Sequence, residues 1–132
     1  VKRLMTIPGV GAIAATALTT FAPPPETFAK GRDFAAWVGL TPRQHSTGGR
    51  ERLGKITRMG QRDIRRLLIT GAVAVVRWAV RKGAPEGTWL ARMLAKKPRM
   101  LVAVALANRM ARVAWAVMRK EEDYRGPAAI AA

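Results

Sequence analysis

The sequence contains no cysteine, and its acidic residues are few beside its basic ones. Without cysteine the chain forms no disulfide and offers no thiolate to a metal ion, a composition that fits a reducing compartment. The 132 residues include 24 Lys and Arg against 8 Asp and Glu, which gives a formal net charge of +16. Such an excess of positive charge favours a polyanion as partner, either nucleic acid or an anionic membrane surface.

The few carboxylates are also poorly placed for metal chemistry. Metal-dependent nucleases bring several carboxylates together around two ions. Here the acidic residues are scattered or gathered near the C-terminal end: Glu26, Asp33, Glu51, Asp63, Glu86, Glu121, Glu122 and Asp123. We therefore predict no metal site and no cofactor in this chain. Because Gly48-Gly49 is not followed by Lys-Ser or Lys-Thr, a phosphate-binding P-loop is not expected either.

A continuous apolar run long enough to cross a membrane is not found near the N-terminus. Residues 4–25 carry no charge, but Pro8, Gly9, Gly11 and the prolines at 23–25 interrupt them, and a spanning helix needs about 20 continuous apolar residues. A basic amphipathic helix can still lie on a lipid surface. Since the basic residues crowd a glycine-containing stretch, nucleic acid is favoured, and we predict no membrane partner.

The remaining signal is helical periodicity, with no strand-like alternation and no internal repeat, so we predict an all-α fold. Glycine and proline breaks predict a short helix that starts at Thr27 or Gly31 and ends at Val38, followed by helices over 61–82, 86–97 and 99–120. These belong to one domain spanning 1–125, with a flexible tail at 126–132. The apolar stripe of the 61–82 helix is predicted to consist of Ile64, Leu68, Gly71, Val75 and Trp78 or Ala79. The core is predicted to include Leu68, Val75, Val102, Leu106 and Val113.

Near the N-terminus, Ile7-Pro8-Gly9-Val10-Gly11 precedes an alanine-rich run. This pattern is typical of a helix-hairpin-helix element, in which glycines form a tight turn and the next helix directs its positive end at a phosphate. Gly9 and Gly11 are therefore candidate DNA-binding residues. The alternative is an ordinary glycine turn between two helices. Farther along, Trp37 could stack on a base, although its spacing from Phe34 favours a place in the core.

The stretch from Gly39 to Gly60 carries the only serine, Ser46, beside the only histidine, His45. A serine hydroxyl can attack a phosphodiester and store the bond energy in a protein–DNA ester, while guanidiniums neutralise the charge that develops on phosphorus. The alternative is a serine that caps the loop or contacts phosphate. His45 is a weak candidate for a general base. The cations that would bind DNA here are Arg43, Arg50, Arg52, Lys55 and Arg58.

Two further groups of residues bear on this chemistry. Arg62, Arg65 and Arg66 follow the loop within two helical turns, and a phosphate-binding role is as plausible for them as a solvated face, which is our interpretation of Arg77 and Arg81. Tyr124 is the other hydroxyl considered as a nucleophile, but it follows Glu121-Glu122-Asp123, whose charge repels phosphate.

These motifs resemble the C-terminal domain of the insertion-sequence family 110 transposases, a group that includes the pilin-gene invertase. The similarity covers residues 7–125 and rests on the hairpin Ile7 to Gly11, the segment Phe34 to Gly49, the segment Leu53 to Gly60 and the run Arg65 to Leu68. The resemblance implies a recombinase that cleaves and exchanges double-stranded DNA through a serine nucleophile, which corresponds to Ser46.

The resemblance also implies partners outside this chain. Family members carry an N-terminal RuvC-like domain with metal-binding acidic residues, so divalent Mg is expected there, and a structured noncoding bridge RNA guides them to DNA. That domain has no counterpart here, and the chain opens on Val1 without an initiator Met. We therefore expect a piece of a homo-oligomeric bacterial protein, cytoplasmic and nucleoid-associated, that is inactive alone.

Two hypotheses of different classes follow from the sequence. The first is a recombinase domain with Ser46 as nucleophile. The second is a non-catalytic module of helix-hairpin-helix type that grips the nucleic-acid backbone through the hairpin and the arginines. A trapped ester between Ser46 and DNA distinguishes them, whereas DNA affinity does not.

Overall fold

The computed structural model describes residues 2–40, 61–84 and 86–122, and every regular element within these ranges is a helix. The all-α prediction is therefore confirmed for the described part of the chain. In chain order the elements are η1 (Leu4–Thr6), α1 (Ala12–Phe21), η2 (Pro25–Thr27), α2 (Gly31–Val38), α4 (Gln61–Lys82), α5 (Trp89–Lys96) and α6 (Arg99–Lys120).

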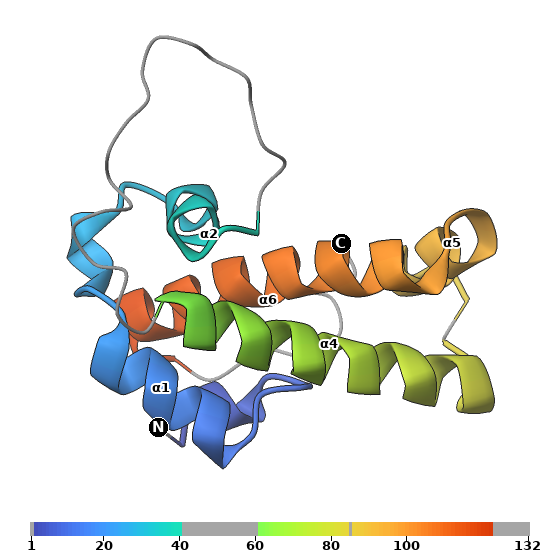
Figure 1. The fold of residues 1–132 in the computed structure, drawn as a ribbon, viewed down its shortest axis with the longest axis horizontal. Coiled ribbons are helices and arrows are strands. Elements are labelled where there is room, and N and C mark those ends of the chain that lie inside the picture. The colour runs from blue at the N-terminus through green and yellow to red at the C-terminus, as the bar shows by residue number, and fades with distance from the viewer. Residues whose placement is uncertain (1, 41–60, 85, 123–132) are drawn as a thin grey trace, which may run out of the picture.

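The two longest helices, α4 and α6, lie side by side and antiparallel and form the long axis of the molecule (Figure 1). The N-terminal hairpin and α1 pack on α4, and α2 crosses the pair on another side. The short helix α5 lies where α4 ends and α6 begins. Because α6 contacts α4, α2, α5 and both 3-10 turns, it is the central helix of the described part of the chain.

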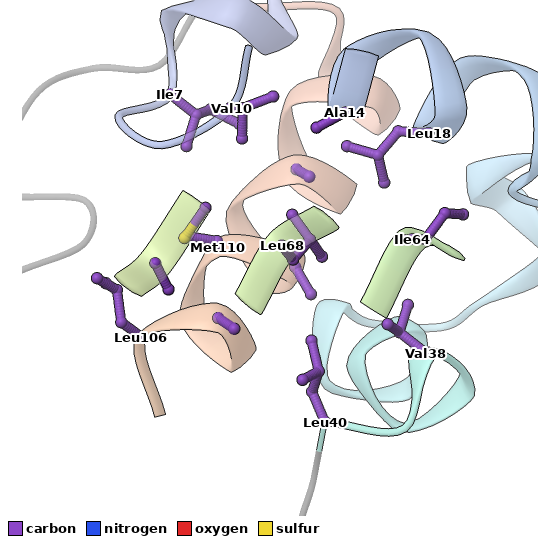
Figure 2. Packing of buried hydrophobic residues seen from close by; sticks show 14 of the residues in the cluster. Ile7, Val10, Ala14, Leu18, Val38, Leu40, Ile64, Leu68, Leu106 and Met110 are labelled. Carbon is purple, nitrogen blue, oxygen red and sulfur yellow. The ribbon is translucent and has the colours of Figure 1, made fainter. Parts of the chain in front are cut away.

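The core forms where the hairpin, α1, α2, α4 and α6 converge, and Figure 2 shows Leu68 and Met110 among side chains from all of them. Leu68, Val102 and Leu106 are buried as predicted. Val75 and Val113, also predicted for the core, are partly buried and pack against its edge.

The buried face of α4 differs from the predicted stripe by a small rotation. Its buried residues are Ile64, Leu68, Ala72, Val76 and Ala79. These steps of four, four, four and three residues keep to one side of a helix with 3.6 residues per turn. Gly71 and Val75, which belong to the predicted stripe, face the hairpin instead. Of the two residues predicted as alternatives at the end of the stripe, Ala79 is buried and Trp78 is 62% exposed.

Local signals account for most helix ends. Gly39 closes α2 in the left-handed conformation, with φ +93°, as predicted. Helix α5 begins at Trp89 rather than at the predicted residue 86. The Thr88 hydroxyl caps it there by accepting a hydrogen bond from the Ala91 N–H at 3.1 Å. The favoured core placement of Trp37 is confirmed: its ring stacks on Phe34 with centroids 5.9 Å apart.

Among the described residues, α6 is the one helix long and apolar enough to cross a membrane, with a mean hydropathy of 1.4. Eight of its residues, including Val102 and Met110, are buried against neighbouring helices, while Met100, Leu101 and Val104 are exposed. A core helix passes the same test of length and composition, and the packing of α6 identifies it as one.

Candidate nucleic-acid interface

The N-terminal hairpin is a tight turn fastened to the middle of α4. The Val10 N–H donates to the Ile7 carbonyl at 3.0 Å, and Gly9 has φ +92°, a conformation that favours glycine. A Cβ atom on Gly71 would overlap the carbonyl oxygen of Gly9, and one on Gly9 would lie 2.9 Å from Cε of Met110. Close packing against α4 thus accounts for both glycines. A DNA contact by Gly9 stays a prediction.

Gly11 has a different environment. It is exposed at the N-cap of α1, its backbone is extended, and a Cβ atom there would meet nothing within 4 Å. No side chain caps this end of α1, and the first-turn N–H groups of a helix carry its positive dipole end. The geometry is therefore open to an approaching phosphate, as the hairpin hypothesis requires.

The arginines at the start of α4 divide between two sides of the helix. Arg62 and Arg66 are exposed one turn apart, and Arg66 borders an open groove between α4 and α1. The groove is lined by Ala12, Ile13, Thr16, Ala17, Thr20, Phe21, Asp63, Arg66 and Leu67. Arg65 turns instead toward α2, where its guanidinium lies so near Gly39 that a Cβ atom there would be 2.5 Å from Nη1.

The hairpin and these arginines do not converge on one point, and they lie on different sides of α4. Gly9 packs at Gly71, and Arg66 and Arg62 lie five and nine residues earlier on α4. At 1.5 Å per residue these are axial separations of about 7.5 and 13.5 Å. Farther along α4, Arg77 and Arg81 are exposed, in keeping with the solvated face assigned to them.

The residues assigned to the chemistry, Ser46 with Arg43, Arg50, Arg52, Lys55 and Arg58, lie outside the described residues. Both borders of their segment are described, and both are anchored. Asn108 on α6 donates from Nδ2 to the carbonyl of Leu40 at 3.1 Å, and Leu40 is itself buried. Gln61, the first residue of α4, donates from Nε2 to the carbonyl of Trp37. The segment 41–60 therefore leaves and rejoins the fold where α2, α4 and α6 meet.

Sequence reasoning missed Asn108 and Gln61 as anchoring residues. The available signal was an amide in the middle of an apolar, alanine-rich helix, since a half-buried polar group needs a hydrogen-bond partner. Its partner, Leu40, is 68 residues away in sequence, and periodicity gives no means of finding it.

A basic helical domain with exposed arginines on one side of a helix is typical of proteins that act on nucleic acid. Comparison with known proteins makes this specific: the chain belongs to the transposase IS116/IS110/IS902 family, whose family model matches residues 1–85. The resemblance to insertion-sequence family 110 transposases is thereby confirmed at the level of the family, and its terms transposase, transposition and insertion sequence apply.

Individual relatives agree. A probable family 20 transposase of Pseudomonas aeruginosa is 47% identical over 125 residues, covering 95% of this chain and 37% of the relative. The putative transposase y4pF/y4sB of Sinorhizobium fredii is 50% identical over 126 residues, covering 94% and 32%. The transposase for insertion sequence element IS1328 of Yersinia enterocolitica is 39% identical over 116 residues, covering 88% and 35%. The chain thus spans about a third of the length of these relatives. No solved structure matches it.

Proposed function

We propose that this chain is the catalytic, DNA-binding domain of an insertion-sequence transposase and that Ser46 is its nucleophile. The observation that carries the proposal is the anchoring of the segment 41–60. Its borders are held by Asn108 and Gln61 at one junction of three helices, and the segment contains the only serine and five of the basic residues. A nucleophile must come within reach of the scissile phosphate, and two anchored borders limit how far from the junction Ser46 can lie, which supports the proposal.

The proposed step conserves charge and atoms. The Ser46 hydroxyl loses its proton and forms an Oγ–P bond while the bond from phosphorus to the departing strand oxygen breaks and that oxygen takes up a proton. A hydroxyl of the incoming strand then attacks the same phosphorus and releases Ser46. Arg43, Arg50 and Arg52 would stabilise the negative charge that builds on the phosphorane oxygens in both steps.

The proposal extends to partners that the family resemblance implies. Double-stranded DNA is the substrate, a structured noncoding RNA guides the complex, and several copies assemble around the recombining strands. A RuvC-like domain elsewhere in the protein would bind Mg, and the site of action would be the nucleoid in the bacterial cytoplasm. In this proposal residues 1–125 supply the serine nucleophile and bind DNA, and the metal ions are bound by residues outside this range.

The test uses a chimaera of the Sinorhizobium fredii relative in which this chain replaces the matched segment. Once the chimaera is shown to recombine, Ser46→Ala should abolish strand exchange, because the nucleophilic hydroxyl is lost. DNA binding and the far-ultraviolet circular dichroism spectrum should stay unchanged, because the substitution removes a single atom and no charge. A reaction quenched in denaturant should leave DNA attached to a peptide containing Ser46. Ser46→Cys should retain trace activity, and Tyr124→Phe should retain full activity.

Recombination by Ser46→Ala at the unsubstituted rate, or an adduct at Tyr124, would refute the serine mechanism. The second hypothesis, a non-catalytic module that grips the backbone, would then remain. It is favoured by its own observations: the uncapped N-terminus of α1 at Gly11 and the exposed pair Arg62 and Arg66.

A further inference from the structure

The ring of Trp78 lies in solvent on the last two turns of α4. The residue is 62% exposed even with Lys82 beside it, whose ammonium nitrogen lies 5.5 Å from the ring centroid. Tryptophan is seldom left so exposed, because burying its large ring stabilises a fold more than burying most other side chains. Packing within the described part of the chain does not account for this ring.

Trp78 continues the side of α4 that the N-terminal hairpin covers. Gly71, Val75 and Trp78 follow one another in steps of four and three residues, so they lie on one side of the helix. The hairpin contacts the first two: a Cβ atom on Gly9 would lie 3.1 Å from the Gly71 carbonyl oxygen and 3.2 Å from Cγ2 of Val75. Trp78 stands apart from the core, against which Val75 packs. It lies about 10.5 Å beyond Gly71 along the helix axis, past this contact.

Three cations surround the ring on the same helix. Arg77 precedes Trp78, and Arg81 and Lys82 follow it by three and four residues, so that all four lie within about 140° around the helix axis. The three cations are exposed, and none forms an ion pair with a described residue, Glu86 included. The single acidic residue of α4 lies in its first turn, at the other end of the helix. The surface around the ring is therefore open to an anion.

A nucleotide carries both of the groups that this surface can bind. Its base has a flat π face that stacks on an aromatic side chain, and its phosphate is an anion that exposed cations bind. A protein partner fits less well, because lysine is depleted in the core of protein–protein interfaces. In a duplex the bases stack on one another, whereas the bases of unpaired nucleotides can stack on a side chain. The chemistry thus favours a single-stranded ligand.

We propose that the C-terminal end of α4 binds unpaired nucleotides of a single-stranded nucleic acid. The residues of this Trp78 surface are Arg77, Trp78, Arg81 and Lys82. One base stacks on the indole ring, and the phosphates on either side of it contact the cations. Arg62 and Arg66, the candidates for duplex binding, lie at the opposite end of α4 (Figure 1). The proposal rests on the nucleic-acid binding of the proposed function but not on Ser46, because a non-catalytic module would use the surface equally.

The test of stacking compares two ligands of the 132-residue chain, an oligothymidylate of about 12 nucleotides and an abasic strand with the same phosphates and no bases. Trp78→Leu should weaken oligothymidylate binding about 5- to 140-fold, the range for one lost stacked base, and leave abasic binding nearly unchanged. Trp78→Phe should recover much of the loss, because it keeps a ring. Phe21→Leu is the matched control: it removes an exposed ring from α1 and should change neither affinity.

The cations are tested separately. Arg77→Gln/Arg81→Gln removes two phosphate contacts and should reduce the log–log salt slope on a single strand by about 1.4. The affinity deficit should then be about 7-fold larger at 50 mM than at 200 mM salt. The control Arg119→Gln/Lys120→Gln removes the same charge from exposed positions at the end of α6 and should change the slope far less.

An oligouridylate of the same length identifies the source of the strand. Tighter binding to it assigns the site to RNA, tighter binding to oligothymidylate assigns it to DNA, and equal binding assigns it to either; each supports the site when Trp78→Leu weakens the binding. Equal losses by Trp78→Leu on the abasic strand and on the strands with bases would overturn it. So would a Trp78→Leu chain that binds every strand as tightly as the unsubstituted chain.

Discussion

Replacing Gly71 by alanine separates two effects that oppose each other in α4. In an isolated helix this change is favourable by about 1 kcal/mol, because glycine is the poorer helix former. In this fold the new Cβ atom would overlap the carbonyl oxygen of Gly9, so that two backbone segments must move apart. We expect the second effect to be the larger one.

The magnitude follows from the nature of the contact. Overpacking in a close-packed interior costs about 1–3 kcal/mol, and the upper part of that range applies because neither partner is a flexible side chain. Subtracting the helix-propensity gain leaves a net destabilisation of about 2 kcal/mol. For a domain of this size that corresponds to a melting temperature lower by about 6–10 °C.

The assay is urea and thermal unfolding of the 132-residue chain followed by circular dichroism at 222 nm. Gly11→Ala is the matched control, since a Cβ atom at Gly11 meets nothing within 4 Å and its backbone is extended. The control should lower the free energy of unfolding by no more than about 1 kcal/mol, because glycine is favoured over alanine at an N-cap but the added Cβ atom meets no clash. A Gly71→Ala chain as stable as the unsubstituted chain would refute the hairpin–helix contact.

Two further substitutions test the anchoring of the segment 41–60 and the placement of Trp37. Asn108→Asp keeps the size of the side chain but cannot donate to the buried carbonyl of Leu40, so we expect a loss of about 1–3 kcal/mol in urea unfolding and a slower chimaera; unchanged stability would contradict the anchor. Trp37→Phe should retain DNA affinity in a titration, because Trp37 packs on Phe34 within the fold, and a large loss of affinity would instead indicate base stacking.

Much of the fold could be predicted because its signals are local. Helix 61–82 was predicted with the bounds observed, since glycines at 60 and 83 flank an unbroken periodic run. Helix 99–120 was predicted equally well from Pro98 and its apolar pattern. The orientation of the buried face of α4 was not predicted correctly. Gly71 fits an apolar stripe in the sequence, whereas in the fold it allows a close approach of α4 to Gly9. Only the position of Gly9 in the folded chain explains why residue 71 is a glycine.

The candidate site divides in the same way. Residue types in the segment 41–60 predicted a nucleophile and a phosphate grip, and those assignments await the chemical test. The anchoring of that segment depends on pairs far apart in sequence, such as Asn108 with Leu40. The stacking of Arg109 on Trp89 likewise joins α6 to α5, two helices that the chain folds back on each other. In sequence Arg109 belongs to an apolar stripe or to a charged one with equal ease, so its stacked position could not be predicted.

The anchor on α6 has a consequence for how Ser46 would be presented to DNA. Asn108 holds the carbonyl of Leu40, the residue that directly precedes the segment 41–60. If the serine proposal holds, weakening this anchor should slow strand exchange even at high DNA concentration, because the change acts on the position of the segment and not on DNA affinity. Ser46→Ala should abolish exchange at every concentration.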